Sequence, residues 1–233
     1  MIDIPKMWIE EHKLYISSVQ GTLSANDLLL NEERNAHKES INIIAGVDEA
    51  GRGPLAGPLV VSSVILPKYI EIEGLDDSKK LSAKKREELM PIIMDKALCY
   101  AIIIIDVETI DSLNILRATH HGMRQSIKQL KIRPDIALID GLPLPDPPVP
   151  QYNLIKGDSR SANIAAASIL AKVTRDNIMD ELDEKYPEYG FSKHKGYPTK
   201  EHLFNLQKCG VSDCHRKSYA PVKEALLQQT LDL

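Results

Sequence analysis

The stretch from Ile44 to Pro58 reads IAGVDEAGRGPLAGP, and its two adjacent acidic residues come at the end of an apolar run. Residues 41–48 have the apolar pattern of a buried β-strand, and a glycine-rich turn with one arginine follows them. The next segment, PLVVSSVIL at residues 58–66, is rich in β-branched residues and bounded by prolines, which predicts a second strand. Because the link between the two strands is short, we expect them to pair in antiparallel fashion.

Strand and helix patterns continue through the rest of the chain. Further strands are predicted at residues 99–107, 135–140 and 151–155. Helices are predicted at residues 82–98, 108–130, 161–186 and, after an N-cap at Thr199, to about Gly210. We therefore expect an α/β protein with a mixed five-stranded sheet, flanking helices and a C-terminal helical region. Three strands in a meander followed by two parallel strands is the layout of the ribonuclease H-like fold, although periodicity alone does not separate it from other mixed α/β folds.

Length and composition describe a soluble globular protein. The chain has 233 residues, of which 43% are hydrophobic and 27% charged. We expect one domain at residues 41–233, preceded by a polar, weakly periodic N-terminal extension at residues 1–40. No apolar run is long enough to span a bilayer, and the first residues lack the apolar core of a signal peptide. We therefore expect a cytoplasmic, monomeric protein with no membrane association.

Cysteine usage argues against a disulfide framework, because there are only three cysteines. Cys209, Cys214 and His215 lie close together in the sequence and raise the alternative of a zinc site. Their spacing matches no common zinc pattern and a second ligand pair is missing, so reduced cysteines are the favoured interpretation.

The net charge of −4 does not indicate nucleic-acid binding. Any such binding has to come from a local basic surface, and two short basic clusters occur, at residues 79–86 and 193–195. Taken alone, each cluster is more simply a solvated lysine-rich face.

Acidic residues end two of the predicted strands. Asp48 ends the first strand and Asp140 ends the fourth, and open α/β sheets place their ligand sites at the carboxyl ends of strands. If these strands are parallel neighbours, the two carboxylates lie side by side. Glu49 adds a third acid, and Asp158, between the fifth strand and the long helix, can project into the same space.

Clustered carboxylates repel one another and raise each other's pKa values, so a cation is needed to neutralise them. A hard divalent ion with oxygen ligands does this, and two such ions can clamp the oxygens of a phosphoryl displacement. An aspartate at a strand end more often caps a turn or a helix. Several acids at matched ends of strands nevertheless favour a metal site.

The glycine turn has two competing interpretations. Gly51, Gly53 and Ala56 loosely fit the G-x-G-x-x-A dinucleotide pattern, but that pattern needs a helix after the glycines and here a strand is predicted. The glycines do allow close backbone approach to a ligand, and Arg52 can bind a phosphate with two hydrogen bonds. The turn could also sense the 2′-hydroxyl that distinguishes RNA from DNA. Tyr197, in HKGYPT, can stack on a sugar or base, or can be a partly buried loop tyrosine.

Several longer motifs together resemble one family, the bacterial type 2 ribonucleases H, or ribonuclease HII. They occur in the family's order between about residues 43 and 223: AGVDEAGRGPLAGPLVVSSVIL, DSKKLS, IDSLNILRATHHGM, ALIDG, IKGDSRSANIAAASILAKVTRD, YPEYGFSKHKGYPTKEHL and HRKSYAPV. The resemblance implies an endonuclease that cleaves RNA in RNA–DNA hybrids. It also implies cleavage on the 5′ side of single ribonucleotides in duplex DNA, the entry step of ribonucleotide excision repair, which leaves 3′-hydroxyl and 5′-phosphate ends.

The resemblance also implies roles for individual residues. The family's acidic positions, which would hold two Mg²⁺ or Mn²⁺ ions, fall on Asp48, Glu49, Asp140 and Asp158. The G-R-G that reads the 2′-hydroxyl falls on Gly51, Arg52 and Gly53. Tyr197 would pack on the deoxyribose after the ribonucleotide, and Lys79 would contact a backbone phosphate. Asp213 stands where the family often has proline, and the N-terminal extension exceeds that of the shortest members.

Two other classes of function remain open at this point. One is a nucleotide-binding module that uses the glycine turn, against which the following predicted strand argues. The other is a nucleic-acid-binding protein without catalysis that uses the two basic clusters, against which the set of four acids argues.

Overall fold

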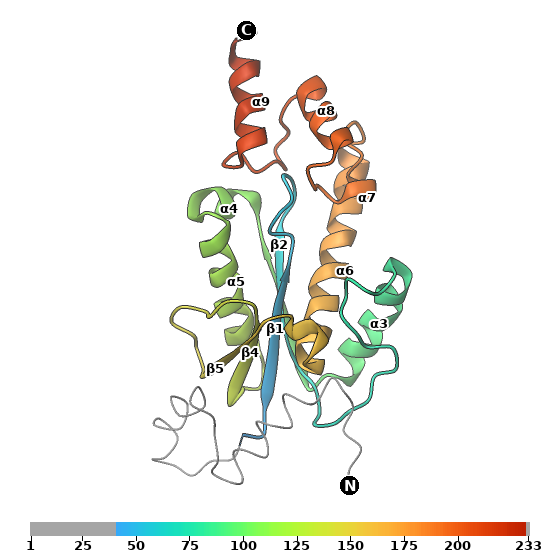
Figure 1. Ribbon diagram of the computed structural model, residues 1–233, viewed down its shortest axis with the longest axis vertical. Helices are drawn as coiled ribbons and strands as arrows, with labels where there is room; N and C mark the ends of the chain where they lie inside the picture. The colour runs from blue at the N-terminus through green and yellow to red at the C-terminus, as the bar shows by residue number, and fades with distance from the viewer. Residues whose placement is uncertain (1–40, 232–233) are drawn as a thin grey trace.

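The computed structural model describes residues 41–231, so the predicted N-terminal extension at residues 1–40 lies outside the described residues. The centre of the structure is a five-stranded sheet with the order β3-β2-β1-β4-β5 (Figure 1). Its strands are β1 (Ile44–Ala50), β2 (Leu59–Ile65), β3 (Cys99–Ile105), β4 (Ile136–Asp140) and β5 (Gln151–Leu154). The predicted mixed five-stranded sheet is confirmed.

The pairing of the strands places the end of β4 beside β1. β1 pairs antiparallel with β2 and β2 with β3, whereas β1 pairs parallel with β4 and β4 with β5. The register between β1 and β4 includes the pair Val47 and Ile139. One step further along both strands are Asp48 and Asp140, which therefore become neighbours. β1 runs two residues past Asp48, so that aspartate lies inside the strand rather than at its end.

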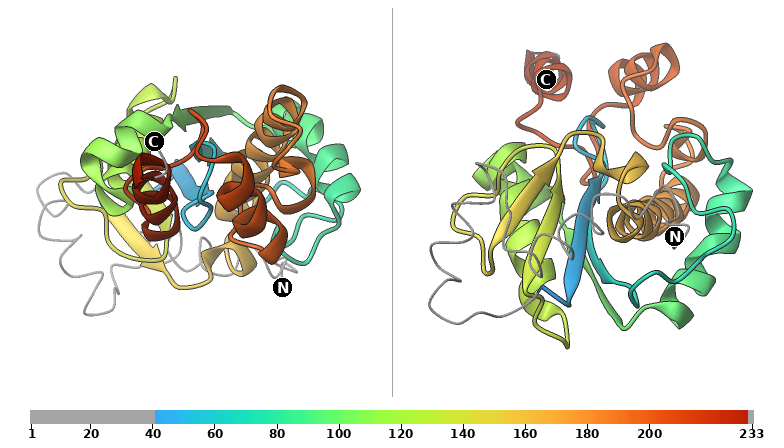
Figure 2. Two further views of the ribbon diagram at one scale, coloured as in Figure 1. Left: turned by 90° about the horizontal axis from the view of Figure 1, so that it is seen from above. Right: turned by 60° about the horizontal axis from the view of Figure 1, so that its bottom comes forward.

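Helices cover both faces of the sheet (Figures 1 and 2). On one face are α3 (Ala83–Lys96) and α6 (Ala162–Lys185), which share a core with apolar residues of β1, β2 and β4. On the other face is α5 (Ile115–Gln129), which packs on Val47, Val61 and Ile139. Since successive strand residues point to opposite faces, neighbouring residues of β1 belong to different cores.

Helix α6 approaches β1 unusually closely, and Gly46 makes this possible. A Cβ atom at Gly46 would lie 2.1 Å from the backbone carbon of Asn163, in the first turn of α6. Ser161 caps that turn by accepting a hydrogen bond from the Ile164 amide at 3.1 Å. The buried alanines that follow have small side chains, which lets the helix stay close to the sheet.

The prediction of a single helix at residues 108–130 is wrong. The chain forms two helices there, α4 (Val107–Leu113) and α5, which are separated at Asn114. Asn114 has φ 67° and ψ 160°, a backbone conformation that no helix contains. Its side chain accepts a hydrogen bond from the Arg117 amide at 3.1 Å, so it caps α5. The break also changes which apolar residues face the core: Leu116, which keeps the helical spacing from Leu113, is 44% exposed, whereas Ile115 packs against the core.

The C-terminal helical region stands at the end of the sheet toward which β1 runs (Figure 1). It contains α7 (Phe191–His194), α8 (Lys200–Cys209) and α9 (Ala220–Leu231). As predicted, Thr199 caps the start of α8: its hydroxyl accepts a hydrogen bond at 3.2 Å from the amide of His202, in the first turn of the helix. The helix ends at Gly210, also as predicted. Within residues 41–231, none of the helices combines the length and the apolar character needed to cross a bilayer.

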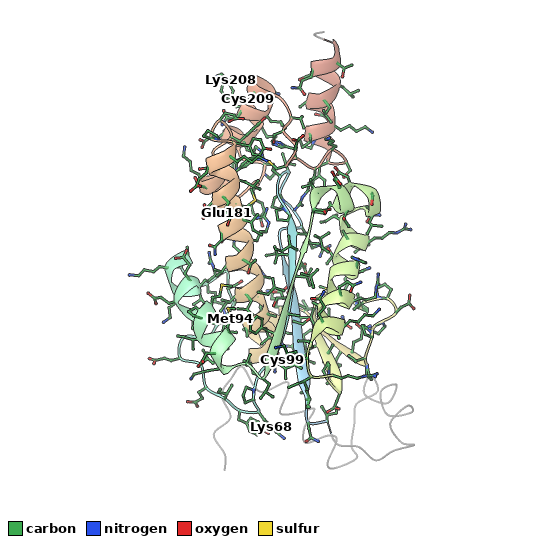
Figure 3. All side chains as sticks on the ribbon, turned by 180° about the vertical axis from the view of Figure 1, so that it is seen from behind. Lys68, Met94, Cys99, Glu181, Lys208 and Cys209 are labelled. Atoms are coloured by element: carbon green, nitrogen blue, oxygen red, sulfur yellow. The ribbon has the colours of Figure 1, made fainter. Side chains whose placement is uncertain are left out.

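The cysteines form no disulfide and no metal group. All three are free, and Cys99 lies at the opposite end of the molecule from Cys209 (Figure 3). The nitrogens of His215 are occupied by Ser212 and His202, at 2.7 and 3.1 Å, so they are not available to a zinc ion. The choice of reduced cysteines over a zinc site agrees with this geometry.

Candidate active site

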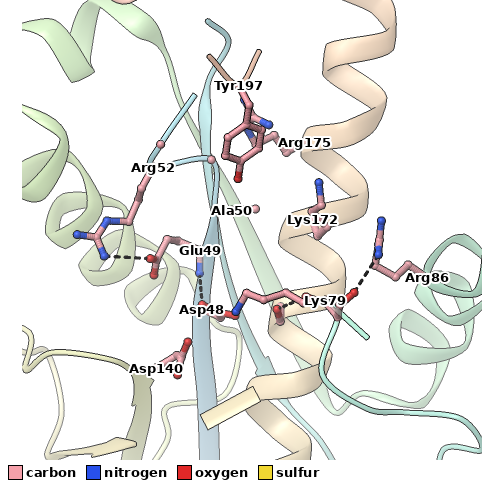
Figure 4. A pocket seen from close by; sticks show the side chains of 14 residues that line it. Asp48, Glu49, Ala50, Arg52, Lys79, Arg86, Asp140, Lys172, Arg175 and Tyr197 are labelled. Atoms are coloured by element: carbon pink, nitrogen blue, oxygen red, sulfur yellow. Dashed lines mark hydrogen bonds and ion pairs between the residues drawn. The ribbon is translucent and has the colours of Figure 1, made fainter. Parts of the chain in front are cut away.

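Three aspartates meet at the carboxyl ends of β1 and β4. Asp48, Asp140 and Asp158 each contribute one carboxylate oxygen to a group in which all oxygens lie within 4.8 Å of one another. Asp48 and Asp158 are almost completely buried, with 4% and 1% exposure. Figure 4 shows Asp48 and Asp140 on neighbouring strands. The prediction from the sequence that these three acids lie close together is confirmed.

Asp158 reaches the group through a short 3-10 turn, η2 (Gly157–Ser159), which precedes α6. The turn is fixed to β4 because the Gly157 amide donates to the Asp140 carboxylate at 2.7 Å. A Cβ atom at Gly157 would come within 2.6 Å of Ile164 and 3.3 Å of Asp140, so only glycine fits there without a shift. The local backbone thus sets the distance between Asp140 and Asp158.

The electrostatics of the group favour a bound cation. Burial raises the pKa of Asp48 well above its usual value, and the charges of Glu49 and Asp140 raise it further. Burial also raises the pKa of Asp140, as does the charge of Asp158, while the hydrogen bond from Gly157 acts in the opposite direction. Three close carboxylates offer hard oxygen ligands, and their mutual repulsion is relieved by a divalent ion. The residues therefore fit Mg²⁺ or Mn²⁺.

Lys79 supplies one compensating charge. Its ammonium lies 3.0 Å from the Asp158 carboxylate, although its side chain is 76% exposed. Burial lowers the pKa of Lys79, but the hydrogen bond and the charge of Asp158 outweigh this, so the pKa is raised. The structure thus places Lys79 at the acids. Its contact with a substrate phosphate stays a prediction.

Glu49 lies apart from the three aspartates. Because side chains alternate along β1, Glu49 points to the opposite face from Asp48, and it is not part of the group of close oxygens. It accepts a hydrogen bond from the Arg52 guanidinium at 3.4 Å. Burial raises its pKa, and the charge of Arg52 opposes this. It still lines the same pocket as Asp48 and Asp140.

One pocket of about 270 Å³ joins the acids to the glycine turn. Asp48, Glu49, Asp140, Lys79, the G-R-G turn and Tyr197 all line it (Figure 4). Tyr197 is 45% exposed, and a Cβ atom at Gly53 would lie 3.5 Å from its ring. Residues that are far apart in the sequence are therefore adjacent around one cavity.

The predicted strand after the glycine turn is present, as β2. A dinucleotide fingerprint requires a helix at this place, so the nucleotide-binding alternative does not fit. Gly51 has φ +100°, and a Cβ atom there would lie 2.1 Å from the Arg175 side chain. This glycine therefore serves the tight packing of the turn.

Sequence reasoning missed several residues that support the site. Ser168 on α6 forms a hydrogen bond with Ser78 at 2.8 Å and another with the Asp48 carboxylate. Arg175 and Arg216 are buried beneath the glycine turn, with 1% and 0% exposure. All three lie in motifs that resemble those of ribonuclease HII. Neither the periodicity nor the spacing of these motifs, however, indicates which residues their side chains contact.

In metal-free solution, the acids are expected to destabilise the protein as pH rises. A carboxyl group with a raised pKa keeps, in the folded state, a proton that the unfolded chain releases near 3.8. Its contribution to the free energy of unfolding therefore falls as pH rises through the raised pKa. The Asp48→Asn variant, which carries no charge there, should be more stable than the wild type at about pH 8 in EDTA and nearly equal to it at about pH 4.5. Thermal unfolding at the two pH values measures this, and a constant difference would contradict it.

A mixed sheet of this strand order, with a group of aspartates beside two neighbouring parallel strands, places the protein in the ribonuclease H-like class. The comparison with known families narrows this class. The model of the family "Ribonuclease HII" matches residues 45–222, and the chain belongs to that family.

Relatives and solved structures agree with the assignment. Ribonuclease HII of Desulfitobacterium hafniense (strain Y51) is 52% identical over 200 residues, which are 86% of this chain and 77% of that protein. Ribonuclease HII of Enterococcus faecalis (strain ATCC 700802 / V583) is 53% identical over 194 residues, covering 83% and 76%. The crystal structure of ribonuclease H2 from Pyrococcus horikoshii OT3 superposes with a TM-score of 0.69 at 26% identity, covering 80% of this chain and 98% of that one. The protein is therefore a ribonuclease H endonuclease that acts on RNA–DNA hybrids.

Proposed function

We propose that this enzyme also cuts on the 5′ side of single ribonucleotides embedded in duplex DNA, leaving 3′-hydroxyl and 5′-phosphate ends. The observation that carries the proposal is the shared pocket, in which the G-R-G turn and Tyr197 lie beside the acids. An enzyme that needs only a long hybrid can find its substrate by helix shape. In this pocket, by contrast, a turn that can contact the sugar of one nucleotide lies beside the acids. Such a site can recognise a single ribonucleotide.

Asp48, Asp140 and Asp158 would hold Mg²⁺ or Mn²⁺, and Glu49 would complete the set from the other side of β1. When bound, such ions activate a water and stabilise the leaving 3′-oxygen. The chain's own contribution is rigidity. Ser168 and the Glu49 amide both bind Asp48, the latter at 2.7 Å, and the Gly157 amide binds Asp140. The carboxylates are thereby held in place before the substrate arrives.

The glycine turn would select the nucleotide to be cut. Gly51 and Gly53 bring the backbone on both sides of Arg52 to the pocket without a side chain of their own, which allows the sugar to approach closely. The Arg52 side chain is half-exposed and carries a guanidinium suited to a phosphate. Tyr197, beside the turn, offers an exposed ring to the next sugar.

A cleavage assay with one DNA duplex that contains a single ribonucleotide tests the proposal. We expect cleavage with Mg²⁺ or Mn²⁺, and products that a ligase can rejoin only when they carry a 3′-hydroxyl and a 5′-phosphate. The matching all-DNA duplex is the control and should stay intact. Cleavage of a long RNA–DNA hybrid without cleavage of the single-ribonucleotide duplex would contradict the proposal.

Replacing Tyr197 by alanine is expected to slow cleavage at single ribonucleotides more than cleavage along RNA tracts. The ring is the part of the pocket suited to the deoxyribose that follows an RNA-to-DNA junction, and stacking of this kind contributes about 1–3 kcal/mol. That corresponds to a roughly 5- to 150-fold loss of kcat/KM on the junction substrate. Tyr197→Phe, which keeps the ring, is the control. Equal losses on both substrates would remove the junction role.

A further inference from the structure

We propose that the segment of residues 214–219 supports efficient cleavage at single ribonucleotides by holding together the two parts of the pocket suited to the ribonucleotide. These parts are the G-R-G turn and the loop that carries Tyr197. The inference rests on the proposed cleavage at single ribonucleotides. It identifies His215, Arg216 and Tyr219 as positioning residues.

Arg216 binds the backbone of the G-R-G turn. Its guanidinium is completely buried and donates five hydrogen bonds, one of which goes to the Tyr219 hydroxyl. The others go to backbone carbonyls of the turn and of the chain that follows it: Gly51 at 2.6 Å, Arg52 at 3.1 Å, Gly57 at 3.0 Å and Pro58 at 3.1 Å. A planar guanidinium with fixed donors holds several peptide planes in one orientation at once.

Tyr219 fixes the same turn a second time. Its hydroxyl accepts a hydrogen bond from Arg216 at 3.0 Å and donates one to the Arg52 carbonyl at 2.6 Å. That carbonyl therefore receives two donors, which use both of its lone pairs. The peptide plane in the middle of the G-R-G turn cannot rotate without losing both bonds.

His215 connects the segment to the loop of Tyr197. His202 lies 3.0 Å from the Tyr197 carbonyl through Nδ1, and its Nε2 lies 3.1 Å from Nε2 of His215. Because a carbonyl only accepts, Nδ1 of His202 carries a proton and its Nε2 accepts from His215. Nδ1 of His215 then accepts from the amide and hydroxyl of Ser212, at 3.1 and 2.7 Å. Burial lowers the pKa of His215 to about 3, which keeps this ring neutral.

Backbone bonds complete the connection between the two parts. The Arg216 amide donates to the Leu55 carbonyl at 2.8 Å, and the Leu55 amide donates to the Gly196 carbonyl at 2.8 Å. The turn, the 214–219 segment and the loop before α8 thus form one hydrogen-bonded unit. The spacing between the turn and the Tyr197 ring follows from this unit.

A fixed spacing matters most when the substrate has only one ribonucleotide. A single ribonucleotide has to meet the turn and the tyrosine at the same time, in one register. An RNA tract offers a 2′-hydroxyl at every position, so a displaced turn can engage a neighbouring nucleotide. Loosening the unit should therefore reduce cleavage at single ribonucleotides more than cleavage of tracts, whereas a smaller folded fraction would reduce both equally.

The Tyr219→Phe variant tests the inference, because it removes one hydroxyl and leaves Arg216 bound to the turn. On the single-ribonucleotide duplex we expect kcat/KM to fall about three- to tenfold, the effect of one lost hydrogen bond, mainly through kcat. The loss on an RNA tract in a hybrid should be smaller, and the unfolding temperature should stay near that of the wild type. Tyr100→Phe, on the edge strand β3 and outside the pocket, is the matched control.

Arg216→Lys should show the same preference for the tract with a larger loss, and Tyr219→Phe remains decisive if the lysine variant does not fold. Equal losses on both substrates, or rates for Tyr219→Phe that match those of Tyr100→Phe, would overturn the inference. A wild-type enzyme that cuts the tract but not the single ribonucleotide would instead overturn the proposed function.

Discussion

The Asp48→Asn variant is expected to lose cleavage by more than about a hundredfold, because residues that merely orient a metal ligand already contribute 10- to 100-fold. Asp48 is the most enclosed member of the pocket's acids, and its carboxylate is held by Ser168 and the Glu49 amide. Asparagine keeps the shape but removes the negative charge. The folded structure and the binding of the hybrid should therefore persist while hydrolysis stops.

Initial rates with saturating Mg²⁺ and with Mn²⁺ measure the loss, and hybrid binding is measured in parallel with the same protein. Asp95→Asn, an exposed aspartate on α3, is the matched control and should cleave as the wild type does. Cleavage by Asp48→Asn at a near-wild-type rate would show that the buried aspartates are not the metal site.

The largest effect on stability is expected for Gly46→Ala. The added methyl group would lie 2.1 Å from the Asn163 carbon and 2.2 Å from the Ile164 nitrogen, and both are backbone atoms in the first turn of α6. Backbone cannot move aside as a side chain can, so α6 would have to shift away from β1. We expect a loss of about 3 kcal/mol in the free energy of unfolding, or a decrease of about 10 °C in the unfolding temperature.

Gly53→Ala is the matched control for stability, because its Cβ atom would meet only the Tyr197 ring, at an ordinary distance of 3.5 Å. Thermal unfolding of both variants in the same buffer makes the comparison. An unfolding temperature for Gly46→Ala equal to that of Gly53→Ala would mean that α6 does not need its close approach to the sheet.

The central sheet and the aspartate pair could be predicted because they rest on local patterns. Asp48 and Asp140 each follow an apolar run that only a buried strand explains. Once the two strands were expected to be parallel neighbours, their carboxylates had to meet. The alternation of side chains also places Glu49 on the opposite face from Asp48, although the sequence prediction grouped it with the other acids.

The helix break at Asn114 could not be predicted from the apolar pattern. It depends on Asn114, whose φ of 67° and ψ of 160° lie in a region that residues other than glycine rarely adopt, and the apolar pattern carries no signal for that conformation. Arg216 and Arg175 escaped prediction for another reason. Their hydrogen bonds join residues that are 165 and 119 positions apart, and no local pattern encodes such contacts.

The central claim is that the acids carry out hydrolysis and that the G-R-G turn selects the nucleotide at which the strand is cleaved. It is tested most directly by mapping the cut, at single-nucleotide resolution, in two DNA duplexes of the same sequence whose single ribonucleotide is shifted by one position. The claim predicts that the cut stays on the 5′ side of the ribonucleotide and moves with it by one position. A cut that stays in place in both duplexes would contradict it.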